Sequence, residues 1–469
     1  MKASPYLSAF AMMLVLFQAC QSNKEKESDG RDSSTAYSLV ADTLEKSLFC
    51  DIIDVWYPRN IDTFYGGYIS GYTRDWKLSQ KSQIKALVQQ ARHVWATSYI
   101  YEAYPDKKEF LEYAAHGFRF LRDAMWDTRY GGFHAYCTRE GTPQESSINE
   151  KKIYGQAFAL YGLSQYYRMS HDPEVLDLAK KSFLWMEEKA HDPLYGGYFE
   201  SLTRDGTPTH LVASPQSGPI GTPFEGVKDY NSSIHVMEAI TELYRVWPDS
   251  LVRARLEEMF FLIRDTFVHP DGYLQLYFMP DWTLITDESL EQSGSDSRGF
   301  GEHFTYGHDV ETAFLLMETA HFLGIGEDEK TRVIAKQLVD HSLESGWDQE
   351  AGGFFDAGKM IDGEIKIINN HKSWWGLVEG LNALLYMHTL YPEDPIDYYG
   401  KFLKAWEHID TYLIDKEFGG WYNNSLDTYP KDEGQDKSHI WKTTYHNTRG
   451  MINCIRTLRS QMKQKIIKQ

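Results

Sequence analysis

Three histidines lie in stretches whose hydrophobic residues recur with helical period. They are His235 in DYNSSIHVMEA, His308 in YGHDVETAF and His446 in WKTTYHNTR. Because the ordinary pKa of imidazole is about 6.5, histidine can accept and release protons at working pH. Any one of them could be a hydrogen-bonded core residue. Three at the starts of parallel helices would instead indicate acid–base chemistry at one place.

Two glutamates follow histidines at a spacing that puts both side chains on one helical face. Glu238 lies three residues after His235, and Glu311 lies three residues after His308. Such a pair could form a buried hydrogen bond or bind a metal. We expect no metal, because no further carboxylate or cysteine joins these residues at ligand spacing.

Other polar and aromatic residues occupy the same early positions in their helical stretches. Each could have a structural role, because arginine stems lie along apolar surfaces and aromatic rings fill cores. Their joint position at the helix starts favours a binding site. These residues are Arg92, Tyr154, Asn231, Trp374, Trp375 and Trp441.

A glycine–aromatic signature, preceded by an aspartate, recurs six times at steps of 65 to 81 residues. Glycine permits the turn, and the alternation that follows suits a short hairpin. The signatures are Gly66-Gly67-Tyr68, Gly131-Gly132-Phe133, Gly196-Gly197-Tyr198, Gly272-Tyr273, Gly352-Gly353-Phe354 and Gly419-Gly420-Trp421. The aspartates are Asp62, Asp127, Asp192, Asp271, Asp348 and Asp415.

Between the signatures the hydrophobic pattern predicts two helices per repeat. Six such pairs can close into an all-α (α/α)6 barrel of twelve helices with short β-hairpins between repeats, because closure buries a core that no single repeat could bury. An open solenoid is the alternative. In the barrel, the helix after each signature is an inner one, so all six inner helices start at one mouth. The predicted helices are 37–57, 83–104, 108–126, 152–169, 175–190, 229–246, 250–267, 307–323, 328–346, 373–391, 396–413 and 443–460.

The N-terminus predicts export. Residues 1–20 read as a bacterial lipoprotein signal with Cys20 as the lipidation site, since the apolar run is too short for a membrane helix. An ordinary cleaved signal peptide is the alternative. Residues 21–36 read as a flexible polar tether, and 37–462 as one catalytic domain. We therefore expect a lipid-anchored protein of the bacterial periplasm or outer membrane.

The net charge and the aromatic content indicate which classes of molecule the protein could bind. The net charge of −19 argues against nucleic acid, which requires a basic surface. An aromatic content of 14% fits a large core or a surface that stacks on sugar rings. Cys50, Cys137 and Cys454 are far apart in the sequence, so we expect buried free thiols, with one disulfide allowed in an oxidising compartment. We expect a monomer.

The sequence resembles the N-acylglucosamine 2-epimerase superfamily, and within it the cellobiose and mannobiose 2-epimerases, over nearly all of residues 37–460. The motifs that carry the resemblance are YGQAFALYGLSQYYR at 154–168, GHDVETAFLL at 307–316 and WKTTYHNTRG at 441–450. The resemblance implies an (α/α)6 barrel and inversion at C2 of the reducing sugar of a β-1,4-linked disaccharide through a cis-enediolate. It implies no cofactor, because no hydride leaves the sugar.

The resemblance also implies roles. His446 and His308 correspond to the acid/base pair, and His235 and Arg92 to groups that polarise the sugar. The implied substrate contacts are Tyr154, Asn231, Glu238, Glu311, Trp374, Trp375 and Trp441. We expect Glu238 and Glu311 to orient the histidines.

Two positions depart from the family pattern: Leu377 stands where glutamine is usual, and Thr444 where proline is usual. Both bear on the distal sugar subsite. The alternative functions are an aldose–ketose isomerase on the same scaffold, an (α/α)6 glycoside hydrolase, which would use mouth carboxylates, and a non-catalytic sugar-binding lipoprotein.

Overall fold

The computed structural model describes residues 30–81, 83–209, 212–213, 224–292 and 302–467, and helices dominate this part of the chain. All twelve expected helices are present within it. Six of them form an inner layer: α4 (Leu87–Ala103), α6 (Ile153–Ser170), α8 (Tyr230–Val246), α11 (Tyr306–Leu323), α13 (Trp374–Leu390) and α15 (Tyr445–Ile467).

The other six helices form an outer layer. Several begin after an aspartate whose carboxylate accepts a hydrogen bond from the first turn, as Asp172, Asp249, Asp328 and Asp397 do. The outer helices are α2 (Gly30–Ser47), which continues through η2 (Leu48–Ile53) and α3 (Asp54–Trp56), α5 (Glu109–Phe120) with η3 (Leu121–Met125), α7 (Pro173–Lys189), α9 (Ser250–Leu262) with η4 (Ile263–Phe267), α12 (Glu329–Ser345) and α14 (Tyr398–Tyr412).

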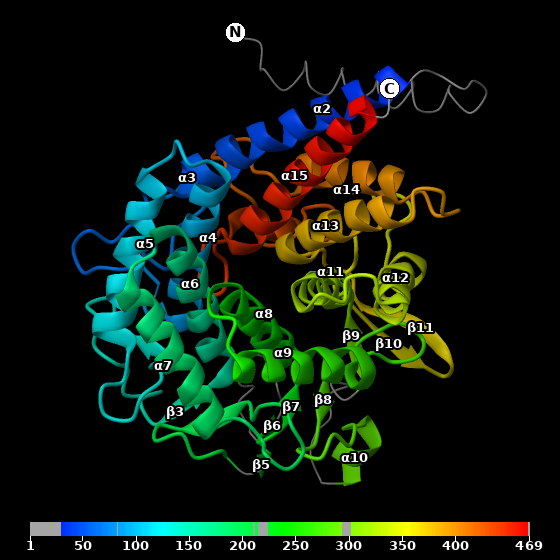
Figure 1. Ribbon diagram of the computed structural model, residues 1–469. Coiled ribbons are helices and arrows are strands. Elements are labelled where there is room, and N and C mark those ends of the chain that lie inside the picture. The colour runs from blue at the N-terminus through cyan, green and yellow to red at the C-terminus, as the bar shows by residue number, and fades with distance from the viewer. Residues whose placement is uncertain (1–29, 82, 210–211, 214–223, 293–301, 468–469) are drawn as a thin grey trace.

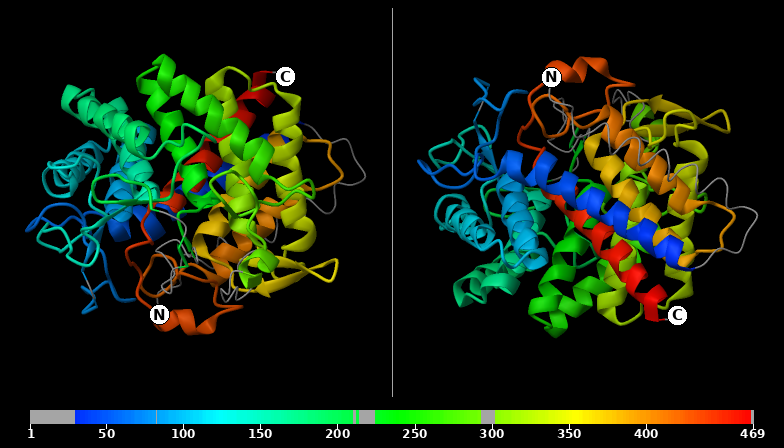
Figure 2. Two further views of the ribbon diagram at one scale, coloured as in Figure 1. Left: turned by 90° about the horizontal axis from the view of Figure 1, so that it is seen from below. Right: turned by 90° about the horizontal axis from the view of Figure 1, so that it is seen from above.

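The inner helices form a closed ring. Each packs against the next in chain order, and α15 packs back against α4 (Figure 1). The outer helices α5, α7, α9, α12 and α14 each cover the inner helix that precedes them, whereas α2 covers α15. Figure 2 shows α2 and α15 side by side. The chain is therefore the predicted (α/α)6 barrel and not an open solenoid.

The first outer helix begins earlier than expected. Helix α2 starts at Gly30, so the end of the segment predicted as a tether, which was to reach residue 36, is helical. The expected signal and Cys20 lie outside the described residues. No helix in the described ranges is long and apolar enough to cross a membrane.

The glycine signatures form tight turns at the mouth. In the first, the amide of Gly66 donates to the carbonyl of Asp62, and the amide of Tyr65 to its carboxylate. Gly67 has a φ of 64°, and a Cβ there would lie 2.4 Å from Oε1 of Gln90. Only glycine fits both constraints.

Five signature aspartates also form an ion pair with a lysine further along the chain. The lysines are largely buried, and in four cases the lysine lies two residues before the next inner helix. The pairs are Lys85–Asp62, Lys151–Asp127, Lys228–Asp192, Lys372–Asp348 and Lys437–Asp415. In the remaining repeat Phe304 takes the lysine's place, and the side chain of Asp271 is 64% exposed. Four of the pairs therefore hold a turn against the start of an inner helix, whereas Lys437 lies in the loop that precedes α15.

The short strands link neighbouring repeats as well as forming local hairpins. A strand before one inner helix pairs with the strand after the next signature: β1 (Lys85–Ala86) with β2 (Tyr136–Cys137), β3 (Glu150–Lys152) with β4 (Ser201–Thr203), β7 (Lys228–Asp229) with β8 (Tyr277–Phe278), and β9 (His303–Thr305) with β10 (Ala357–Ile361). The remaining elements are β5 (Val212–Ala213), β6 (Phe224–Glu225), β11 (Glu364–Asn369), α10 (Asp287–Gln292) and η5 (Pro430–Gly434). The last takes the place of a hairpin after the sixth signature.

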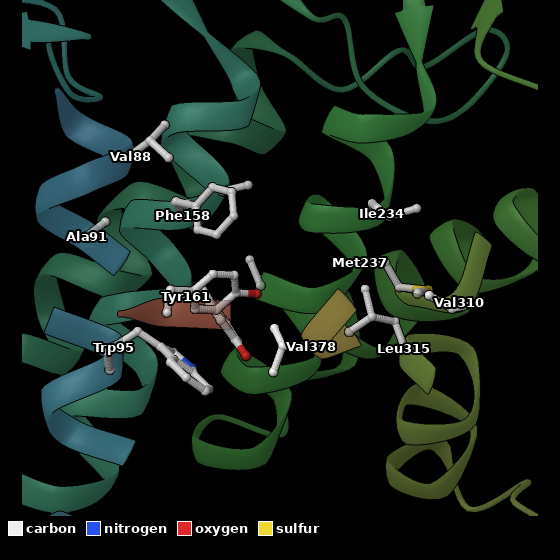
Figure 3. Packing of buried hydrophobic residues seen from close by; sticks show 14 of the residues in the cluster. Val88, Ala91, Trp95, Phe158, Tyr161, Ile234, Met237, Val310, Leu315 and Val378 are labelled. Atoms are coloured by element: carbon white, nitrogen blue, oxygen red, sulfur yellow. The ribbon is translucent and has the colours of Figure 1, made fainter. Parts of the chain in front are cut away.

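The core lies between the inner helices and between the two layers. Figure 3 shows the inner part, where the buried side chains include Trp95 of α4, Tyr161 of α6, Met237 of α8 and Leu315 of α11. Burial of this continuous apolar surface fixes the positions of the helix starts. The three cysteines in the described ranges are free thiols; Cys137 and Cys454 are buried as expected, but Cys50 is exposed.

Candidate active site

His446 lies in the first turn of α15 and is hydrogen-bonded to a carboxylate of another inner helix. Its Nδ1 is 2.8 Å from Oε1 of Glu379 on α13, and 3.9 Å from Oε1 of Glu311 on α11. Sequence reasoning assigned Glu311 to the orientation of the histidines. The carboxylate hydrogen-bonded to His446 is instead that of Glu379. Glu311 forms no hydrogen bond with His308 either.

His308, in the first turn of α11, has hydroxyl partners. Nδ1 lies 2.6 Å from Oγ1 of Thr305, and the ring also contacts the hydroxyl of Tyr230 at the start of α8. The two histidines proposed as a proton-transfer pair are thus held differently, His446 by an anion and His308 by neutral groups.

Trp375 contacts both of these histidines. Its ring centroid is 4.5 Å from that of His308 and 5.6 Å from that of His446. Its neighbour Trp374 faces another way, with its ring 6.0 Å from His439 and 5.2 Å from Nζ of Lys442. The structure therefore brings Trp375, but not Trp374, into contact with the histidines.

His235 forms the pair expected from its spacing. Its Nδ1 lies 2.8 Å from Oε2 of Glu238, and the other oxygen of Glu238 accepts the hydroxyl of Tyr445 at 2.6 Å. The ring of His235 also contacts Tyr154, with centroids 5.4 Å apart.

Arg449, one turn beyond His446, ties three buried carboxylates together. It donates to Glu238, to Glu311 and, at 2.7 Å, to Glu379. Ligand atoms of Glu311, Glu379 and His446 lie within 4.8 Å of one another, a spacing that could hold a metal ion. The guanidinium already supplies a cation to both glutamates of that group.

Arg92 joins the remaining predicted residues. Its guanidinium donates to the hydroxyl of Tyr154 at 2.8 Å and to the carbonyl of Trp441 at 3.1 Å, and lies 4.3 Å from the ring centre of Phe158. Arg92 is therefore a buried cation and not a solvated helix charge. Asn231 stands at the start of α8 with its buried Oδ1 lacking a partner.

Burial sets the protonation of the site. It holds the pKa of His308 well below its usual value, helped by the nearby His235 and His446, and lowers that of His446 in the same direction. Burial raises the pKa of Glu379. For Glu238, burial is outweighed by Arg449 and His235, so its pKa falls to about 2. Neutral imidazoles and an ionised Glu238 follow at neutral pH.

Sequence reasoning did not single out Arg449, Tyr230 or Thr305, nor the contact of Glu379 with His446. One signal was available, because Arg449 follows Tyr445 by four residues and so shares its helical face. The contact between Glu379 and His446 crosses from one inner helix to another, which sequence spacing does not encode.

The arrangement can move protons. Two neutral imidazoles from different helices approach one mouth, and the guanidinium of Arg92 and the ring of His235 lie close to them, where donors can stabilise an oxygen anion. The fold, with its buried histidines at one mouth, is that of an (α/α)6-barrel enzyme.

The chain belongs to the N-acylglucosamine 2-epimerase family of sugar epimerases, whose model matches residues 67–449. It is 26% identical to the cellobiose 2-epimerase of Bacteroides fragilis over 419 residues, which cover 89% of this chain and 99% of that protein.

Solved structures of sugar epimerases and isomerases share this fold. The cellobiose 2-epimerase of Spirochaeta thermophila superposes with a TM-score of 0.75 at 27% identity, covering 91% of this chain and 98% of that one. A D-mannose isomerase superposes with a TM-score of 0.73 at 20% identity, covering 89% and 98%, which shows a shared fold.

Proposed function

We propose that the chain inverts C2 of the reducing-end sugar of a β-1,4-linked disaccharide of the cellobiose or mannobiose type. The observation that carries this proposal is the pair of buried imidazoles, His308 and His446, whose rings both lie against Trp375. Relatives named cellobiose 2-epimerase, which align over almost their whole length, support the substrate class.

The reaction begins with ring opening. Only the aldehyde at C1 makes the C2 proton acidic, so the proton on O1 must leave and O5 must gain one. One histidine then removes the C2 proton, and the electron pair passes into a cis-enediolate. The second histidine takes a proton from solvent and delivers it to the opposite face of C2, while the first histidine releases the C2 proton to solvent. Ring closure then reverses the first step. No proton is gained or lost overall.

We assign His446 and His308 to the two faces of C2. Because Nδ1 of His446 donates to Glu379, its Nε2 carries the free electron pair. Arg92 and His235 stabilise the enediolate oxygens, and one such donor typically contributes about 2.7–4 kcal/mol. Glu238 orients His235 through their 2.8 Å contact.

Glycoside hydrolysis fits less well. It needs one mouth carboxyl group as a free acid and a second as base or nucleophile. Glu238, Glu311 and Glu379 all accept hydrogen bonds from Arg449, a shared cation that favours ionised carboxylates over the free acid that hydrolysis needs.

The deciding experiment is proton NMR of the protein with cellobiose and with β-1,4-mannobiose in D2O. We expect signals of the C2 epimer with deuterium at C2. Ketose signals would make the enzyme an isomerase that returns the proton to C1, and monosaccharides would make it a hydrolase. Binding with no exchange for either sugar would leave a sugar-binding protein.

We further propose that Cys20 carries a lipid and holds a monomer at the periplasmic or outer membrane. Its short apolar run and terminal Ala19-Cys20 support this proposal. Cys20→Ser should move the protein from the membrane fraction to the soluble one, and light scattering of the soluble form should give one chain's mass. An unchanged fractionation would contradict the anchor.

A further inference from the structure

A second polar cluster lies at the mouth, where β3 and β4 meet the starts of α6 and α8. It consists of Lys152, Glu200 and Asp229, which are 8%, 0% and 1% exposed. Nζ of Lys152 is 3.3 Å from Oε2 of Glu200, and the charges of Lys152 and Glu200 both act on Asp229. None of the three belongs to the histidine site.

Lys152 stands at an electrostatically unfavourable place. It is the N-cap residue of α6, where the helix dipole repels a cation and where Ser, Thr, Asp or Asn is usual. Its neighbour Lys151 already makes the structural pair with Asp127. At the matching positions the other inner helices have Ala86, Asp229, Thr305, Ser373 and Thr444. A second buried lysine therefore calls for a separate role.

Lys152 lines a small, partly open pocket between α4 and α6. Tyr154, Tyr136 and Trp441 supply aromatic walls, and Leu87 adds an aliphatic one. Arg92 connects this pocket to the histidine site, because it donates to both Tyr154 and Trp441. Aromatic walls with one fixed donor suit a sugar ring, whose faces are apolar and whose edge carries hydroxyls.

Three buried acceptors without partners lie in the cluster or two residues from it in the sequence. Oε1 of Glu200, Oδ2 of Asp229 and Oδ1 of Asn231 are buried and have no hydrogen-bond partner. A buried acceptor left unpaired is costly, so the cluster offers acceptors to a ligand rich in O–H donors that reaches it. With two carboxylates for one ammonium, the cluster favours a neutral sugar over an acidic one.

We propose that Lys152, held by Glu200, determines specificity by hydrogen-bonding a hydroxyl of the sugar that is not epimerised. This inference rests on the proposed function, since the histidines would hold the reducing sugar. Lys152 acts on binding of the second ring and takes no part in proton transfer.

The test compares three variants with wild type. They are Lys152→Met, the double variant Lys152→Met/Glu200→Gln, and the control Lys77→Met, which replaces a lysine whose side chain is 81% exposed. We expect KM for the disaccharide to rise about tenfold or more in both Lys152 variants, as for loss of one charge-assisted hydrogen bond, with kcat within about threefold. Deuterium exchange at C2 of glucose or mannose should be unchanged. The double variant removes the unpaired carboxylate and guards against misfolding.

An unchanged KM in a folded Lys152 variant would overturn the inference. So would an equal loss of disaccharide and monosaccharide exchange, which would mean that the cluster only supports the histidine site. Calorimetric titration with cellobiose and with β-1,4-mannobiose tests binding without turnover. If wild type binds but does not epimerise, the proposed function fails, while tenfold weaker binding by Lys152→Met would still support the subsite. If wild type binds neither sugar, the inferred subsite at Lys152 is overturned.

Discussion

Nδ1 of His446 lies 2.8 Å from Oε1 of Glu379, although the two residues are 67 positions apart on different inner helices. This contact fixes the tautomer of the imidazole and leaves Nε2 for the substrate. It also connects His446 to the carboxylates around Arg449, because Glu379 accepts a hydrogen bond from that guanidinium.

Glu379→Gln should lower kcat about 10- to 100-fold with little change in KM, because Glu379 positions a base without touching substrate. Loss of the anion also destabilises the imidazolium, so the pKa of His446 should fall and the acid limb of the pH–kcat profile should move to lower pH. Steady-state kinetics from pH 4.5 to 8 would show both effects. Equal kcat and an unmoved limb would contradict the positioning role.

His446→Phe and His308→Phe should each reduce epimerisation by about 10²- to 10⁴-fold, the range typical of a lost general acid or base. His321→Phe, at the far end of α11 from His308, is the matched control and should remain active. NMR in D2O measures turnover, and circular dichroism checks the fold. A folded His446 variant with normal turnover would remove the proposed proton-transfer pair.

Arg449→Met should lower the free energy of unfolding by about 3–5 kcal/mol, because it leaves three buried carboxylates without their cation. Arg456→Met, on the same helix but 43% exposed, should cost less than about 1 kcal/mol. Urea denaturation measures both. Adding Glu379→Gln to Arg449→Met should restore part of the loss, and an unaltered stability would refute the arginine's central role.

Lys228→Met should lower the free energy of unfolding by about 3–5 kcal/mol, since the lysine is fully buried on Asp192. Lys330→Met, whose pair with Asp265 is solvated, should change it by less than about 1 kcal/mol. Thermal and urea unfolding would compare them. Similar values for the two variants would mean that the lysine–aspartate pairs do not stabilise the turns.

Asp229→Asn should gain stability relative to wild type as pH rises. Burial and the charge of Glu200 raise the pKa of Asp229 to about 7, whereas an unfolded chain has about 3.9. Between these two pKa values the Asp229 carboxyl is protonated in the folded state but ionised in the unfolded chain. The free energy of unfolding of wild type therefore falls as the pH rises from about 4 to 7. Asparagine keeps the cap on α8 but cannot ionise.

Urea denaturation at pH 4.5 and 7.5 measures this effect. The difference in free energy of unfolding between Asp229→Asn and wild type should change by on the order of 2 kcal/mol between the two pH values. Glu200→Gln should lower the pKa of Asp229 and move the fall to lower pH. A difference between Asp229→Asn and wild type that does not depend on pH would show that Asp229 keeps its charge throughout.

The fold could be predicted because its signals are local and repeated. Two helices per repeat follow from hydrophobic period, and the signature before each inner helix fixes which end forms the mouth. The early start of α2 was missed because GRDSS carries no apolar stripe.

The candidate site could be predicted only where partners share a helix. The spacing of His235 and Glu238 predicted their hydrogen bond, whereas the same spacing at His308 and Glu311 did not produce one. There, Arg449 from α15 provides a stronger partner for the carboxylate. Trp374 and Trp375 could not be told apart, because adjacent helical residues point about 100° apart and the sequence leaves open which one faces the barrel centre.

One joint of the barrel differs from the other five. Each of α4, α6, α8, α11 and α13 packs against the outer helix that follows it in the chain, but α15 packs against α2, and Arg459 reaches back to Glu45. The two ends of the domain thus meet side by side, so a circular permutant that links them and opens another loop would keep every contact of the ring. The same seam orders events during synthesis. His446 and Arg449 belong to the last helix of the ring, so until that helix has left the ribosome, the growing chain has neither a closed barrel nor a complete site.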